Sequence, residues 1–342
     1  MARSSPSWVS CILQLSAMNN SAFTSLSKLI KKSKKRIHAR SRSQAEKQLP
    51  TRCPLTVAAQ NYFFLQSLME SATEPGVNEV EAGSERLVIS LTSIEARLYE
   101  VATTVESLLR QTVRADAIVL WLDRHRWSME NLPIALLRQM ERGLSVRFCD
   151  DIGPHTKLIP ALRAFPEATI ITVDDDVLYP FYLVERLMRA FRTDPSRIYC
   201  TRARRLDVDR QKGVSYLGCP NLHESAEGIA VFPLGVGGVL YPPGIFEDEE
   251  IFNLAQQKRL APKADDIWFK AMSLRKGVVC QKIHFRRESF PLTPFSQEVE
   301  LQQYNVREGG NDQQLRATFD HYGLWSALDA EQSSHDLRVA GP

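Results

Sequence analysis

The amino-acid sequence predicts an α/β fold in which helices cover both faces of a mostly parallel β-sheet. Short runs of consecutive apolar residues alternate along the chain with segments whose apolar residues recur at helical spacing. Continuous apolar runs are typical of strands buried on both faces, and strand–helix alternation is typical of parallel sheets. Ligands of such sheets bind at the carboxyl ends of the strands. The polar residues that follow each apolar run are therefore the candidates for a functional site.

The expected elements begin after residue 85. Five segments are expected to form strands: residues 87–91, 118–122, 144–148, 170–173 and 278–280. Five segments are expected to form helices: residues 101–109, 131–140, 157–165, 180–191 and 265–272. Asn131 is the candidate N-cap of the second helix, and Pro180 is the expected first residue of the fourth.

Three adjacent carboxylates close the fourth expected strand: Asp174, Asp175 and Asp176. Neighbouring carboxylates repel one another, so a folded protein retains them where a positive charge lies close by. A hard divalent cation bound to substrate phosphates would supply this positive charge. Strand alternation would send Asp174 and Asp176 to one side and Asp175 to the other. The pattern predicts an enzyme that acts on a nucleotide diphosphate.

Charge is distributed unevenly along the 342 residues. The net formal charge is +3, but residues 1–48 carry ten Lys/Arg residues and one acid, so the remainder carries −6. Eight of the ten lie between residues 28 and 42. This basic segment predicts either a solvated tail or peripheral contact with an anionic membrane surface. Nucleic acid is not an expected partner, because the run has no interleaved aromatics and the body is acidic.

Three segments are expected from these patterns: a basic N-terminal extension with a linker (1–84), a catalytic domain (85–290) and a C-terminal lid or tail (291–342). The six cysteines are scattered without a C-x-x-C pair, which favours reduced thiols. The N-terminal apolar run precedes its basic residues, unlike a secretory signal. We therefore expect a cytoplasmic protein, with possible peripheral location at the inner face of the membrane.

Six short motifs occur in a fixed order along the chain. They are Leu91-Thr92-Ser93 with Arg97, Ser107-Leu108-Leu109-Arg110-Gln111, Gly153-Pro154-His155-Thr156-Lys157-Leu158, Val173-Asp174-Asp175-Asp176, Gly235 to Pro243 and Ala264-Asp265-Asp266-Ile267-Trp268. With this ordered set, residues 86 to about 285 resemble the GT-A-fold (Rossmann-like) glycosyltransferases, in particular family 2 of bacterial glycan synthesis. The resemblance implies transfer of a sugar, with inversion, from a UDP- or GDP-sugar donor to a glycan or lipid-linked acceptor. It also implies Mn²⁺ or Mg²⁺ on the donor pyrophosphate.

The resemblance assigns roles to particular residues. The expected metal ligands are Asp176, Asp174 and His284. Asp266 is the expected general base on the acceptor hydroxyl, with Asp265 in reserve. The expected donor-binding residues are Thr92, Arg97, Asp123, Lys157, Asp174 and Asp175.

Each assignment has a structural alternative. Asp265 and Asp266 could simply stabilise a helix N-terminus, and Asp123 could form a turn. Arg97 could be a surface side chain, and Lys157 could extend from its helix into solvent. The glycines of residues 235–243 fit an acceptor-side loop or a tight turn beside a strand. Trp268 could stack on a sugar or belong to the core.

Two other functions remain open. A sugar-phosphate nucleotidyltransferase would need a glycine-rich, lysine-bearing loop after the first strand, where the chain has Leu91-Thr92-Ser93-Ile94-Glu95. A non-catalytic module that binds nucleotide or glycan would not need both acidic motifs. The phosphate-binding G-x-x-x-x-G-K-[ST] motif does not occur in the sequence, which argues against a P-loop kinase or ATPase.

Overall fold

The computed structural model describes residues 54–79, 86–206, 216, 218–246, 249–285, 290–293 and 309–329. These residues all fall in one compact unit, residues 53–342. The basic segment 28–42 lies outside the described residues, so its expected role stays a prediction.

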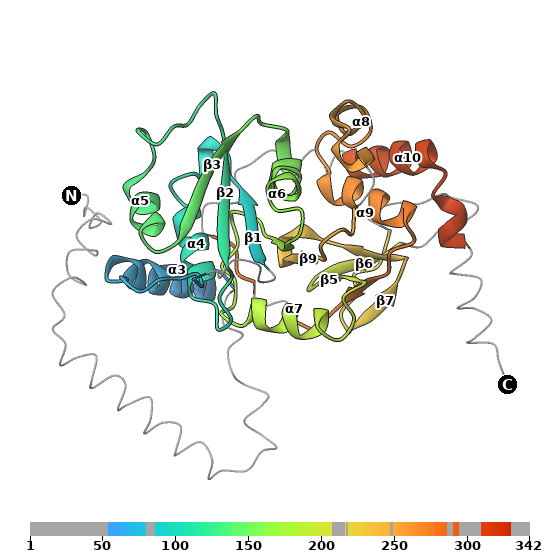
Figure 1. Cartoon of the computed structure of the whole chain (residues 1–342). Coiled ribbons are helices and arrows are strands. Elements are labelled where there is room, and N and C mark those ends of the chain that lie inside the picture. The colour runs from blue at the N-terminus through green and yellow to red at the C-terminus, as the bar shows by residue number, and fades with distance from the viewer. Residues whose placement is uncertain are drawn as a thin grey trace, which may run out of the picture. The chain divides into compact units, whose positions relative to one another are not determined.

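The unit is built on an eight-stranded sheet with the order β3-β2-β1-β4-β9-β5-β10-β7 (Figure 1). The strands are β1 (Leu87–Thr92), β2 (Ala117–Asp123), β3 (Leu144–Cys149), β4 (Thr169–Thr172), β5 (Ile198–Cys200), β7 (Ala226–Gly228), β9 (Val239–Tyr241) and β10 (Cys280–Lys282). The pairs β1/β2, β1/β4, β2/β3 and β5/β10 are parallel, whereas β9 runs antiparallel to both β4 and β5, and β7 to β10. A two-stranded sheet of β6 (Ala203–Arg205) and β8 (Val231–Pro233) accompanies it. The predicted α/β class with a mostly parallel sheet is confirmed.

Helices pack on both faces of the sheet, as the continuous apolar strands predicted. Alternate strand residues such as Ile89 and Ile171 share one core with α4 (Val101–Leu109), α5 (Ile134–Met140) and α7 (Leu183–Phe191). Their neighbours Val88 and Ile170 share the other core with α6 (Ile159–Ala164), α8 (Leu254–Leu260), α9 (Asp265–Arg275) and α10 (Gly310–Tyr322). The strands are thus shielded from water on both sides, which leaves their ends as the place for a site.

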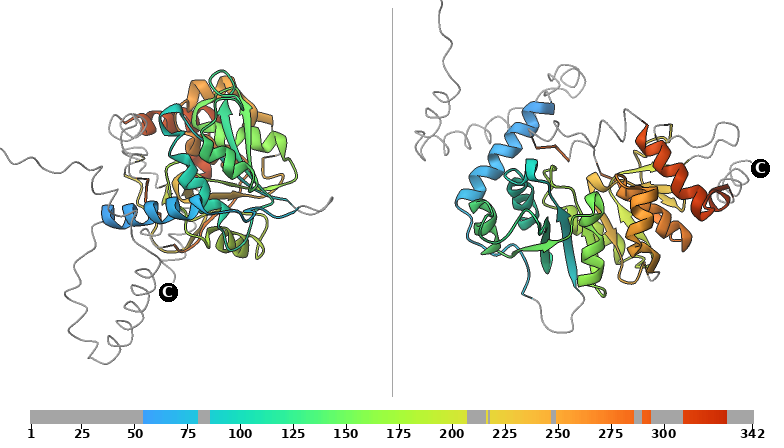
Figure 2. Two further views of the ribbon diagram at one scale, coloured as in Figure 1. Left: turned by 90° about the vertical axis from the view of Figure 1, so that its left-hand side faces the viewer. Right: turned by 90° about the horizontal axis from the view of Figure 1, so that it is seen from above.

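Two helices come from the segments 1–84 and 291–342, which were expected to lie outside the catalytic domain, and both pack against it. Helix α3 (Pro54–Glu70) lies beside α4 in both views of Figure 2. It is held by buried Leu65 and by a hydrogen bond of 2.5 Å from Gln66 Nε2 to Thr103 Oγ1. Near the other end of the chain, Leu315 and Phe319 of α10 are fully buried in the core shared with α9. The described parts of both segments therefore contribute to the packed body.

Several helix and strand ends differ from the expected ones. Asn131 is not an N-cap, because its side chain accepts from the Ser128 N–H (2.7 Å) and closes a turn before the helix. Pro133 takes the N-cap position of α5 instead. Helix α7 begins at Leu183, whose N–H donates to the carbonyl of Pro180. The strand expected at 278–280 is β10, two residues later, where it pairs with β5.

Among the described residues, no helix combines the length and apolar character needed to cross a bilayer.

Candidate active site

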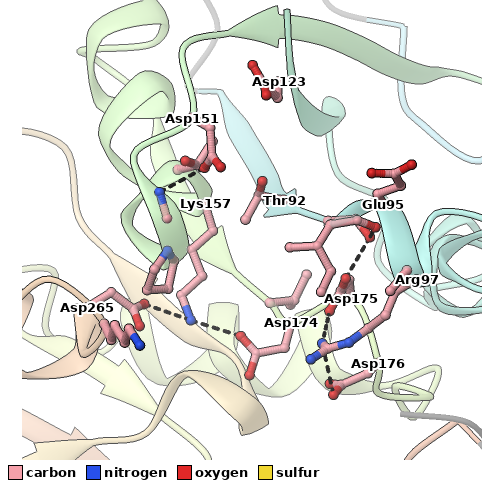
Figure 3. A pocket seen from close by; sticks show the side chains of 18 of the residues that line it. Thr92, Glu95, Arg97, Asp123, Asp151, Lys157, Asp174, Asp175, Asp176 and Asp265 are labelled. Atoms are coloured by element: carbon pink, nitrogen blue, oxygen red, sulfur yellow. Dashed lines mark hydrogen bonds and ion pairs between the residues drawn. The ribbon is translucent and has the colours of Figure 1, made fainter. Parts of the chain in front are cut away.

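A cavity of about 960 Å³ opens at the carboxyl ends of β1, β2 and β4. Figure 3 shows its charged side chains converging from these strands and from the start of α9. The expected residues that line it are Thr92, Arg97, Asp123, Lys157, Asp174, Asp175, Asp176, Asp265 and Asp266. The cavity therefore brings together nearly all the candidates from segments up to about 170 residues apart in the sequence.

His284 is the exception. It is not among the residues that line the cavity, and its Nδ1 lies 3.3 Å from Oε2 of Glu224, with both side chains exposed. The structure thus places this expected metal ligand in a surface contact with Glu224 instead of beside the aspartates.

The three aspartates closely follow the end of the fourth strand. Strand β4 ends at Thr172, so Asp174 to Asp176 lie in a turn where the two-residue repeat of a strand no longer holds. Nη1 of Arg97 contacts both Asp175 Oδ1 (2.5 Å) and Asp176 Oδ2 (3.1 Å), as Figure 3 shows. Asp174 turns instead toward Lys157. Asp175 and Asp176 thus share one cation, Arg97, while Asp174 pairs with Lys157, and that Asp174 and Asp176 reach one metal ion stays a prediction.

Asp175 belongs to the supporting framework of the cavity. It is 6% exposed, and Ser93 Oγ donates to its Oδ2 at 2.6 Å while Arg97 contacts Oδ1. Its backbone carbonyl accepts from Thr104 Oγ1 of α4 at 2.9 Å. These contacts fix Arg97 and the acidic turn to the first strand and its helix.

We expect Asp175→Ala to destabilise the protein, because it leaves the largely buried Arg97 guanidinium without its closer partner. Breaking one side of such a pair costs about 3 kcal/mol. Urea unfolding of the variant and of Glu95→Ala, an exposed acid on the same cavity wall, provides the comparison. Equal midpoints for the two variants would contradict the supporting role.

Lys157 does not extend into solvent. The side chain is buried, and its Nζ lies 2.8 Å from Asp174 Oδ1 and 2.9 Å from Asp265 Oδ2 (Figure 3). Burial alone would lower the pKa of Lys157, but Asp174, Asp265 and Asp266 raise it well above its usual value. A permanently charged ammonium therefore links the acidic turn to the acidic pair at the start of α9.

Asp266 lies at the base of the cavity, partly exposed. The N–H of Gly235 donates to both of its oxygens, at 3.1 and 3.0 Å. Burial and the neighbouring Asp265 raise the pKa of Asp266 to about 7, although Lys157 opposes the rise. A carboxyl with a pKa in this range can accept a proton near neutral pH, as a general base must.

A side chain at Gly235 would displace the Lys157 ammonium or the Asp266 carboxylate. A Cβ there would lie 2.4 Å from Lys157 Nζ and 3.0 Å from Asp266 Oδ1. The residues Gly235–Gly237 form a short 3₁₀ turn immediately before β9, so the tight turn beside a strand is the correct local structure for this part of the glycine motif. Trp268 is fully buried and its indole N–H donates to the carbonyl of Ile251, which makes it a core residue.

Tyr179 is a supporting residue that the sequence gave no reason to select. Its hydroxyl accepts from the Asp174 N–H at 2.8 Å and donates to the Val236 carbonyl at 3.3 Å. The buried phenol thus ties the acidic turn to the glycine turn that holds Asp266.

The opposite end of the cavity is lined by Thr92, Asp123 and Trp127. Thr92 Oγ1 donates to the Trp121 carbonyl at 2.9 Å, and Asp123 Oδ1 accepts from the His125 N–H at 3.0 Å. Asp123 therefore forms the turn that was its structural alternative and faces the cavity as well. Trp127 adds an aromatic surface that the sequence analysis did not select.

The cavity has a surplus of negative charge. Eight carboxylates line it (Glu95, Asp123, Asp151, Asp174, Asp175, Asp176, Asp265 and Asp266), against four basic side chains (Arg97, Arg126, Lys157 and Lys263). Burial and the neighbouring Asp174 raise the pKa of Asp176 to about 7, with Arg97 opposing. The acidic turn is thus incompletely neutralised by the two buried cations.

The carboxylate oxygens of the cavity are suitable ligands for a divalent cation that binds together with substrate phosphates. In the part of the chain that the structure describes, no three His, Cys, Asp or Glu side chains form a metal-binding group. Two carboxylates, Asp174 and Asp176, are nevertheless enough for Mg²⁺ or Mn²⁺ when substrate oxygens and water complete the coordination.

The fold and the cavity define an α/β protein with a charged site at the carboxyl ends of its parallel strands. Among solved structures, the chain is similar to the mannosyltransferase PcManGT from Pyrobaculum calidifontis in complex with GDP-Man and Mn²⁺, at 13% identity, TM-score 0.41, and coverage of 84% of this chain and 85% of that one. It is similar to S. aureus TarS 1–349 in complex with UDP (13% identity, TM-score 0.41, 60% and 62% covered). It is also similar to CMP:2-keto-3-deoxy-manno-octonic acid synthetase with CTP (11% identity, TM-score 0.36, 59% and 90% covered).

No protein-family model and no curated protein matches the chain significantly. At these identities and TM-scores the structural similarities establish neither a family nor an activity.

Proposed function

We propose that the protein is a GT-A-type glycosyltransferase that uses a nucleotide-diphosphate-sugar donor with Mn²⁺ or Mg²⁺. The observation that carries the proposal is the cavity in which Lys157 joins Asp174 of the acidic turn to Asp265, with Asp176 and Asp266 lining the same cavity. A transferase of this kind needs two acidic centres, one for the donor phosphates and one for the acceptor hydroxyl. Both acidic groups, Asp174 with Asp176 and Asp265 with Asp266, line the same open cavity, which supports this proposal.

The donor diphosphate is assigned to the acidic turn. A diphosphate brings negative charge into a cavity that already has an acid surplus, so a cation must accompany it. Asp176 and Asp174 would hold this metal ion, which stabilises the charge on the leaving nucleoside diphosphate. Arg97 lies beside both Asp175 and Asp176, where its guanidinium can contact a phosphate oxygen.

The acceptor hydroxyl is assigned to Asp266. Both of its oxygens accept from Gly235 N–H, and the neighbouring Asp265 is paired with Lys157. Removal of the hydroxyl proton by Asp266 would let the acceptor oxygen attack the sugar carbon opposite the leaving diphosphate, with inversion. The acceptor is a glycan or a lipid-linked sugar, and Asp265 acts by holding Lys157.

The nucleoside is assigned to Thr92, Asp123 and the neighbouring Trp127, which line the remaining part of the cavity. UDP- and GDP-sugars are the candidate donors. We further propose peripheral contact of residues 28–42 with the anionic inner face of a membrane and a cytoplasmic location for the catalytic unit, because a lipid-linked acceptor would lie there.

Two alternatives make different predictions. A nucleotidyltransferase would release pyrophosphate from a nucleoside triphosphate and a sugar phosphate. A non-catalytic module would bind a nucleotide sugar without consuming it. A thermal-shift screen of UDP-, GDP- and CMP-sugars and of CTP, each with and without Mn²⁺, identifies the ligand, since a ligand of the native state raises its melting temperature. Hydrolysis or transfer assays on that ligand then separate the three functions, and stabilisation by CTP alone would contradict the proposal.

The transfer rate is expected to depend on pH through Asp266. Because the base acts in its ionised form, activity falls as pH drops below its pKa of about 7. At saturating donor and Mn²⁺, kcat should rise about tenfold between about pH 6 and pH 8. At limiting Mn²⁺ the rise should be steeper, because protonation of Asp176, whose pKa is also about 7, competes with the metal. A rate that is flat across this range would contradict Asp266 as the base.

A further inference from the structure

We infer that the outer face of α3 inserts into an anionic lipid surface through Phe63 and Phe64. The inference deepens the membrane contact proposed above for residues 28–42 and rests on it. It adds an apolar docking surface within the described body of the protein.

Phe63 and Phe64 are unusually exposed for their size. Phe63 is 68% exposed and Phe64 53%, and the ring of Tyr62 packs edge-on against Phe63. Three consecutive aromatic side chains thus form a patch on one helix, which we call the α3 aromatic patch (residues 62–64). Aromatic residues are enriched where a protein meets the interface of a bilayer.

The inner face of α3 is fixed, so the patch is presented by a rigid element. Leu65 is buried, Gln66 bonds to Thr103, and the Leu68 carbonyl accepts from Arg110 Nη2 at 3.0 Å. Arg110 is itself bound to the fully buried Glu106 of α4. The helix cannot roll to bury its aromatic residues without breaking these contacts.

The composition of α3 suits a lipid surface. Its sequence contains no charged residue before Glu70, the last residue of the helix, although 24% of the whole chain is charged. Besides Phe63 and Phe64, the exposed residues of α3 from residue 59 onward are the uncharged Gln60, Asn61 and Ser67 and the terminal Glu70, so the two phenylalanines are the side chains that gain from burial in the acyl boundary.

The positive charge of the basic segment (residues 28–42) indicates that the partner of the α3 aromatic patch is an anionic lipid surface. Its eight Lys/Arg residues end at Arg42, only eleven residues before α3 begins at Pro54. Each basic residue near an anionic bilayer contributes about 1 kcal/mol, and stable membrane binding generally needs two signals. Basic residues and the α3 aromatic patch supply one electrostatic and one apolar signal in adjacent parts of the chain.

The test is flotation of the full-length protein with vesicles of phosphatidylcholine alone or with about 30 mol% phosphatidylglycerol. We expect the wild type to float with the anionic vesicles only, and Phe63→Ser/Phe64→Ser to lower the partition coefficient about tenfold or more. The matched control is Ile134→Ser on α5, which removes an apolar side chain of equal 68% exposure far along the chain from the basic segment. It should bind as the wild type does.

Other outcomes would overturn the inference. Unchanged vesicle binding by the double variant would restrict lipid contact to the basic residues. No vesicle binding by the wild type, together with a dimer in light scattering that the double variant abolishes, would make the patch a contact between copies. Binding of RNA in preference to anionic vesicles would assign the basic segment to nucleic acid. Thermal shifts with nucleotide sugars are measured on the same preparations, so failure of lipid binding with donor binding intact refutes this inference without refuting the proposed activity.

Discussion

Asp266→Asn is expected to lower kcat for sugar transfer by about 10²–10⁴-fold, the range that general-base catalysis contributes. Asparagine has nearly the same shape and can still accept from the Gly235 N–H, but it cannot take the acceptor proton. Binding of the donor with Mn²⁺ should stay within about threefold of the wild type, because the donor is assigned to the other acidic centre.

Asp151→Asn is the matched control for this substitution. Asp151 lines the same cavity, is exposed, and accepts from the Gly153 N–H at 2.8 Å, a contact that asparagine can keep. The control should retain most of the activity. Loss of donor binding in Asp266→Asn, or equal losses of kcat in the two variants, would refute the assignment of the base.

Asp176→Asn is expected to abolish metal-dependent turnover and yet to raise the melting temperature at about pH 8 by a few degrees. In the folded protein the charged form of Asp176 is disfavoured by burial and by Asp174, which raise its pKa from 3.8 to about 7. The folded state therefore retains a proton that the unfolded chain releases between these two values. The resulting cost to stability is absent below the unfolded pKa and complete above about pH 7.

The pH dependence of this stabilisation is the decisive readout. The melting temperatures of the variant and the wild type should converge as pH is lowered toward about 4, separate between about pH 4 and 7, and differ by a constant amount above about pH 7. The loss of one contact to Arg97 offsets part of the gain, since Asp175 keeps the closer one. Activity with Mn²⁺ retained in Asp176→Asn, or a variant less stable than the wild type at alkaline pH, would contradict the account.

The central strands were predictable because their local sequence carries the information. The runs at β1, β2 and β4 are mostly apolar and end in polar residues, so both their burial and the place of the site followed from the pattern. Strand β9 was missed as a strand because its three residues follow a glycine turn, and its pairing with β4 and β5 joins segments far apart in the sequence.

The residues of the site were more predictable than their partners. Asp174 to Asp176 and Asp265 with Asp266 were selected because adjacent carboxylates are conspicuous in a sequence. Their pairing with Arg97 and Lys157 depends on contacts across 17 to 108 residues, which no local pattern encodes. Tyr179 gave no signal at all, because a tyrosine near a strand end is usually part of the core.

The most direct test is isothermal titration of GDP and of UDP into the wild-type protein and Asp176→Asn, each with and without Mn²⁺. The account predicts that at least one nucleotide binds the wild type with measurable heat only when Mn²⁺ is present, and that this heat is lost in the variant. Binding that is equally strong without Mn²⁺, or no heat from either nucleotide in the presence of the metal, would contradict the proposal that the aspartate turn holds a cation and a diphosphate.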